Sequence, residues 1–154
     1  MKYLIPLVVI AVLLFYFFLP ASNDEDASSK IEVVLNHIIS SGERKDVNVF
    51  MEYFSPDYKD SSARTRLVIK KIVQKTLDRF ESMEGGYSNL IVSTIVDERG
   101  DTQTVASLDI WIRGIKSGTT YKLIGTEQNP KNVHMVFESV MLGGWKILSV
   151  EGIK

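Results

Sequence analysis

The sequence predicts an α+β domain in which three helices come first and about five antiparallel strands follow. Hydrophobic residues recur at helical spacing from Ile31 to Phe80, whereas β-branched and aromatic residues dominate with a period of two from Tyr87 onward. Turn residues rich in Gly, Asn, Asp and Pro separate the strand-like segments. Helices followed by consecutive antiparallel strands are typical of α+β folds.

The bulk composition sets the class of protein. The chain has 154 residues, a formal net charge of -1 and no cysteine. One domain is therefore expected over residues 30–154. The near-zero charge gives no electrostatic reason to expect nucleic acid as a partner. The absence of cysteine excludes disulfides and thiolate metal ligands.

An apolar segment precedes this domain. Residues 3–19 carry no charge and as a helix would span about 25 Å, the short end of what a bilayer core requires. Residues 1–20 are therefore predicted to form a transmembrane signal anchor, with the lipid bilayer as a partner through residues 3–19. Lys2 lies before the segment and acidic residues 24–26 lie after it, which predicts a cytoplasmic N-terminus and an extracytoplasmic domain, periplasmic or at the cell surface.

The alternative for this segment is a secretory signal peptide that is removed. The best cleavage site, Leu19-Pro20-Ala21, places a large residue where a small one is preferred. The sequence therefore favours a retained anchor, and secretion after cleavage remains the alternative.

The first two helices are bounded by capping residues. Residues 21–29 are small and acidic, which predicts a flexible spacer. A capping box at 29–32 begins the first helix and Gly42 ends it. Asp46 caps a shorter second helix, which ends at Ser55-Pro56 because the residue before proline is excluded from the helical region.

The longest helix and the strands complete the domain. A third helix is predicted over 63–83, with Gly85-Gly86 as its terminator. Alternation of hydrophobic residues then predicts strands at 87–96, 102–115, 119–128, 132–142 and 145–150.

Three stretches of the sequence carry a likeness to a known superfamily. A helix leads to Lys45-Asp46, the run FMEYFSPDYKD follows at 50–60, and the chain closes on GGWKILSV at 143–150. With a long helix between them, these stretches resemble the nuclear transport factor 2-like superfamily, which includes ketosteroid isomerases, scytalone dehydratase and polyketide cyclases. The resemblance spans nearly all of residues 30–154. It implies a cone in which a curved antiparallel sheet wraps around the helices.

The resemblance implies a cavity rather than one reaction, because the superfamily holds enzymes, ligand binders, dimerisation modules and transport adaptors. Its enzymes place an Asp, His or Tyr in the cone for proton transfer. The catalytic candidates here are Asp60 or Asp109 as a base and Tyr58 as a hydrogen-bond donor. The residues expected to line the cavity are Tyr53, Tyr58, Phe80, Leu108 and Ile110.

Strand parity argues against Asp109 as a base. Alternate residues over 106–110 form an apolar face predicted to meet the helices, which turns Asp109 and Trp111 outward and brings Asp109 near Arg113. With the opposite parity, Asp109 would be a buried carboxylate in the cavity, and this alternative stays open. An outward Trp111 is predicted to contact a second copy through the convex face of the sheet.

The remaining polar candidates have structural explanations. Asp57 and Asp60 flank Tyr58 near the expected mouth of the cone, but a turn after Pro56 and a cap on the third helix account for them. The two histidines, His37 and His134, show no metal-binding spacing. No metal or cofactor is therefore predicted.

These observations predict a membrane-anchored, extracytoplasmic module that binds a small apolar ligand or a protein partner without catalysis. The first alternative is an isomerase, dehydratase or cyclase acting on a small hydrophobic substrate. The second is an accessory subunit of an envelope protein assembly.

Overall fold

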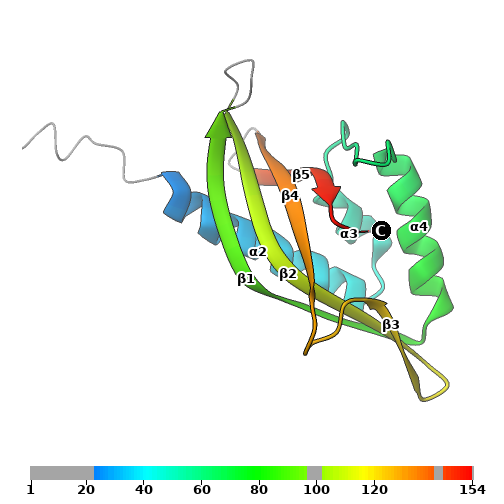
Figure 1. Ribbon diagram of the computed structural model, residues 1–154. Coiled ribbons are helices and arrows are strands. Elements are labelled where there is room, and N and C mark those ends of the chain that lie inside the picture. Colours follow the sequence, from blue (N-terminus) through cyan, green and yellow to red (C-terminus); the bar gives the residue numbers. More distant parts are fainter. Residues whose placement is uncertain (1–22, 97–101, 141–143, 154) are drawn as a thin grey trace, which may run out of the picture.

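The computed structural model describes residues 23–96, 102–140 and 144–153. These residues form three helices followed by five strands, so the α+β prediction is confirmed. Figure 1 shows how they are arranged in space. The helices are α2 (Asn23–Glu43), α3 (Val47–Glu52) and α4 (Arg66–Arg79). The strands are β1 (Ser82–Val96), β2 (Thr102–Lys116), β3 (Thr119–Ile124), β4 (Lys131–Val140) and β5 (Gly144–Glu151).

The strands form one antiparallel sheet in the order β1-β2-β4-β5, and β3 pairs with the end of β2. The long strand β2 is central because it pairs with β1, β3 and β4. In Figure 1, α2 crosses one face of the curved sheet, and α4 stands beyond α3, far from the start of α2. The space between α2, α4 and the sheet is where a cavity can form.

The core confirms the predicted parity of β2. Ala106, Leu108 and Ile110 are buried, and they pack with the apolar stripe of α2 that includes Ile31 and Leu35. Burying one such aliphatic side chain contributes about 1.5–3 kcal/mol, so this face fixes the register of the strand. A smaller cluster of Val47, Leu77, Phe80 and Met83 joins the end of α4 to the start of β1.

The first helix begins earlier than the sequence predicts. α2 starts at Asn23, so residues 23–29 are helical and are not the expected spacer. Ala27 is buried one turn before Ile31 and extends the apolar stripe. Asp26 accepts a hydrogen bond from Lys30 Nζ at 2.7 Å, which supports the added turn. Ser29 therefore lies inside the helix and does not begin it.

The third helix is shorter than predicted at both ends. Ala63 has a left-handed φ of 58°, and Thr65 is extended at the N-cap, so α4 begins only at Arg66. Phe80 is extended at the other end, and Gly85-Gly86 lie within β1 instead of ending a helix. The reason is packing on β2, because a Cβ on Gly86 would lie 2.8 Å from Nε1 of Trp111.

The predicted membrane anchor at residues 3–19 lies outside the described residues. Among the helices that are described, none combines the length and the apolar character needed to cross a membrane.

Candidate ligand-binding cavity

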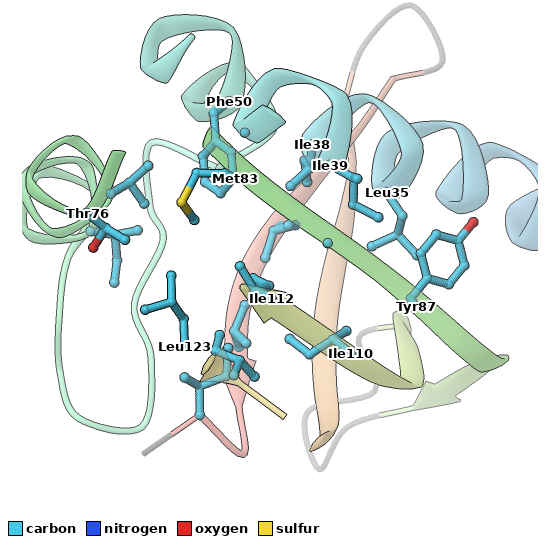
Figure 2. A pocket seen from close by; sticks show the side chains of 18 of the residues that line it. Leu35, Ile38, Ile39, Phe50, Thr76, Met83, Tyr87, Ile110, Ile112 and Leu123 are labelled. Carbon is cyan, nitrogen blue, oxygen red and sulfur yellow. The ribbon is translucent and has the colours of Figure 1, made fainter. Parts of the chain in front are cut away.

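A cavity of about 460 Å³ lies between α2, α4 and the sheet. In Figure 2, Leu35 and Ile39 of α2 and Thr76 of α4 lie on different sides of the space, with Ile112 and Leu123 of the sheet between them. Most of the lining side chains are aliphatic or aromatic. Pockets for small molecules in proteins are typically about 300–1,000 Å³ and mostly apolar, so both the size and the lining suit a small ligand.

Three of the five residues predicted to line the cone do so, namely Tyr58, Leu108 and Ile110. Tyr53 and Phe80 are not among the lining residues. The Tyr53 hydroxyl lies 2.6 Å from Nδ1 of His37, which keeps that ring beside α2. Phe80 belongs to the smaller core cluster because its ring fills the space above Gly114 of β2.

The loop between α3 and α4 is fixed to the edge of the sheet by backbone hydrogen bonds. The N–H of Ile147 donates to the carbonyl of Tyr53, and the N–H of Ser55 donates to the carbonyl of Ile147. Further along, the N–H of Lys59 donates to the carbonyl of Leu148. These bonds hold the loop along β5 and place Tyr58 and Asp60 at the cavity.

The sequence predicts that Asp60 caps the third helix, but the N-cap of α4 is Thr65. Asp60 instead stabilises the loop. Its side chain is 1% exposed. Oδ1 accepts the N–H groups of Ser62 and Arg64, both at 2.9 Å, and Oδ2 accepts Nε of Arg64 at 2.6 Å. Burial alone would raise the pKa of Asp60, but these hydrogen bonds and the Arg64 charge lower it below the ordinary value. The ionised carboxylate is therefore a poor proton acceptor.

Tyr58 is the other polar residue that this loop brings to the cavity. The residue is 4% exposed, and its ring packs edge-on against Phe54. Burial, with a contribution from the Asp60 charge, raises the pKa of Tyr58 to about 12. No described residue is hydrogen-bonded to its hydroxyl, and the hydroxyl oxygen is reached by solvent. Tyr58 thus remains a protonated donor that lines the cavity.

Arg64 lines the cavity and was not among the sequence candidates. Its side chain is 36% exposed, and its Nε is held by Asp60. The spacing of four residues between an acid and an arginine was visible in the sequence, but it is common on helices. Only the tight turn over 60–64 brings this pair to the cavity.

Asp109 lies away from the cavity, as the strand parity predicts. It accepts hydrogen bonds from Asn89 Nδ2 at 2.8 Å and Asn132 Nδ2 at 2.9 Å, and these bonds lower its pKa. The expected partner, Arg113, instead pairs with Glu84 and stacks 5.3 Å from the centre of the Trp111 ring. Asp109 is thus part of an exposed polar network. A homodimer contact through Trp111 stays a prediction.

No family model matches the sequence, and no curated protein matches it either. Solved structures do match. A putative scytalone dehydratase from Novosphingobium aromaticivorans is 16% identical, with a TM-score of 0.64 over 80% of each chain. A nuclear transport factor 2-like superfamily protein from Salmonella enterica is 15% identical, with a TM-score of 0.63 over 84% of this chain and 93% of its own. A protein from N. aromaticivorans with a cystatin-like fold is 16% identical, with a TM-score of 0.60 over 98% and 89%.

Proposed function

We propose that this chain, which has the nuclear transport factor 2-like fold, binds a small and largely apolar molecule in its cavity without transforming it. The observation that carries the proposal is the cavity of about 460 Å³ with its apolar lining. Burying an apolar ligand there gains roughly 25 cal/mol for each Å² removed from water. The affinity is expected to come mainly from this burial.

The case against catalysis is the state of Asp60 and Asp109, the two acids that the sequence offers as bases. A general base needs an accessible lone pair and a pKa near the working pH. Asp60 uses its oxygens to hold Ser62 and Arg64, and its pKa is lowered. Asp109 lies on the outside of the sheet. The superfamily includes enzymes, so turnover of a bound hydrophobic substrate would replace this proposal with the isomerase, dehydratase or cyclase alternative.

Filling the cavity is expected to abolish ligand binding. Thr76 lines the cavity and is half-buried, and its hydroxyl only donates to the Ile72 carbonyl of the same helix, so Thr76→Trp places an indole in the space at little structural cost. The full chain in nanodiscs is titrated with the polarity-sensitive fluorophore prodan, and the signal of empty nanodiscs is subtracted. The expected loss of affinity is at least about tenfold.

The matched control is Gln74→Trp, two residues away on the same helix and exposed, with no side chain in the cavity. It is expected to bind prodan as the unchanged protein does. Equal affinity in both tryptophan variants would contradict binding in this cavity.

We further propose that residues 3–19 hold the domain at the outer face of a membrane, which follows from their apolar character and from the charges that flank them. Alkaline phosphatase, which becomes active only outside the cytoplasm of a bacterial host, is fused after residue 154. Activity in the membrane fraction is expected, and deletion of residues 3–19 should abolish it. A fluorescent C-terminal fusion that matures in the cytoplasm would contradict the orientation.

A further inference from the structure

We propose that the ligand carries a hydrogen-bond-accepting oxygen at one end of its apolar body, and that the Tyr58 hydroxyl and the Arg64 guanidinium bind this oxygen. The inference rests on the proposed function and adds the chemistry of the ligand. Both residues come from the loop between α3 and α4 and line the cavity.

The first support is the unsatisfied donor on Tyr58. The residue is 96% buried, because 4% of its surface is exposed, yet its hydroxyl has no hydrogen-bond partner within the described part of the chain. Every fully buried polar side-chain atom of the described residues has a partner, so the unpaired Tyr58 hydroxyl oxygen is reached by solvent and faces water when the cavity is empty. A ligand oxygen in the cavity would satisfy this hydroxyl.

The second support is the arrangement of Arg64. Its Nε donates to Asp60, while the two terminal nitrogens make no hydrogen bond to the residues that the structure describes. Tyr58, Asp60 and Arg64 lie in one short stretch of the loop, and all three line the cavity. Asp60 thus fixes the Arg64 side chain through its Nε, and the same loop brings the donors of Arg64 and Tyr58 to the cavity.

The polarity of this end selects an acceptor. The Tyr58 hydroxyl and the terminal nitrogens of Arg64 can donate hydrogen bonds to a ligand. The Asp60 oxygens already accept hydrogen bonds from Ser62 and Arg64. Because the Asp60 carboxylate offsets the Arg64 charge, a neutral carbonyl oxygen suits the site at least as well as a carboxylate.

Several other polar groups of the cavity already have a partner. The Thr76 hydroxyl donates to the Ile72 carbonyl at 2.9 Å, and the Tyr87 hydroxyl donates to Oδ1 of Asn36 at 3.2 Å. Glu84, which also lines the cavity, is paired with Arg113. Glu43 and Trp111 also line the cavity: Glu43 can accept but not donate, and the Trp111 ring stacks with the Arg113 guanidinium. The loop of Tyr58 and Arg64 thus supplies most of the donors that the described residues leave for a ligand, which favours a ligand with a polar end.

The test compares ligands of nearly equal shape on the unchanged full chain in nanodiscs. 2-Acetylnaphthalene, 2-naphthoate and 2-ethylnaphthalene share the same apolar body, but only the first two carry an acceptor oxygen. The ketone or the carboxylate is expected to bind at least about tenfold tighter than the ethyl compound by displacement of prodan. If 2-acetylnaphthalene binds more tightly than 2-naphthoate, the difference in affinity between them is attributed to repulsion of the carboxylate by the Asp60 charge.

Two variants locate the effect. Tyr58→Phe keeps the ring and removes only the hydroxyl, so it should reduce the preference for the oxygen-bearing ligands several-fold while binding of 2-ethylnaphthalene is unchanged. Tyr87→Phe is the matched control, because Tyr87 also lines the cavity but its hydroxyl is bound to Asn36. Thermal unfolding of each variant verifies that it is folded.

Two negative results are distinguishable. Saturable binding of all three naphthalenes with equal affinity would overturn this inference and leave the proposed function standing. A failure of all three, and of prodan, to bind saturably would overturn the proposed function as well.

Discussion

Replacement of Asp60 by alanine is expected to lower the free energy of unfolding by about 2 kcal/mol, which is large for a residue outside the hydrophobic core. The carboxylate is 1% exposed and accepts three hydrogen bonds. Alanine would leave the N–H groups of Ser62 and Arg64 and the Arg64 guanidinium without this partner. Because Arg64 is partly exposed, water would satisfy part of what is lost. Urea unfolding, monitored by circular dichroism, measures the difference.

The same carboxylate should make stability depend on pH. The folded protein holds the pKa of Asp60 below its ordinary value, so ionisation stabilises the folded state above the unfolded pKa of about 3.9. That contribution is lost as the pH falls through the folded pKa. Asp60→Asn should therefore cost stability at pH 7 and cost progressively less below about pH 4.

Asp57→Ala is the matched control, because Asp57 lies in the same loop with its side chain exposed. It should change the free energy of unfolding by less than about 0.5 kcal/mol. A cost for Asp60→Ala no greater than that of Asp57→Ala would show that the hydrogen bonds of Asp60 do not stabilise the loop.

The parts of the fold that follow local patterns were predictable from the sequence. Alternation along 106–110 is unambiguous because polar and apolar residues exchange at every step, and it gives both the buried face of β2 and the outward direction of Asp109. The order of helices and strands follows from the change of hydrophobic period near residue 83. The start of β1 could not be predicted in this way. Gly85-Gly86 is compatible with the end of a helix and also with a strand that packs closely against the Trp111 side chain.

The candidate site was predictable only in part, because a loop forms it. Tyr58 was identified through its neighbours in the sequence, but the role of Asp60 depends on a left-handed residue at Ala63 and on hydrogen bonds across four residues. In the sequence, Arg64 is one of several cations that precede or belong to the helix at 66–79. Its position at the cavity depends on the pairing of residues 53–59 with β5, and a contact so distant in sequence leaves no local pattern.

The second large effect is expected at Gly114. This glycine of β2 is buried, and a Cβ built on it would lie 2.5–2.7 Å from three atoms of the Phe80 ring. Real carbon atoms do not approach so closely, and Phe80 cannot retreat easily because it is packed with Val47, Leu77 and Met83. Gly114→Ala is therefore expected to lower the free energy of unfolding by about 3 kcal/mol, near the upper end of the usual cost of overpacking.

A double-mutant cycle tests this cause directly. Phe80→Ala alone should cost about 3–5 kcal/mol, because it empties a core site. In that background the ring is absent, so Gly114→Ala should cost less than about 1 kcal/mol, and the coupling energy between the two sites should exceed about 1 kcal/mol. Gly42→Ala supplies the control, since a Cβ there meets no atom within 4 Å. If Gly114→Ala lowers the free energy of unfolding by the same amount with and without the Phe80 ring, the destabilisation comes from the strand backbone and not from a clash with the ring.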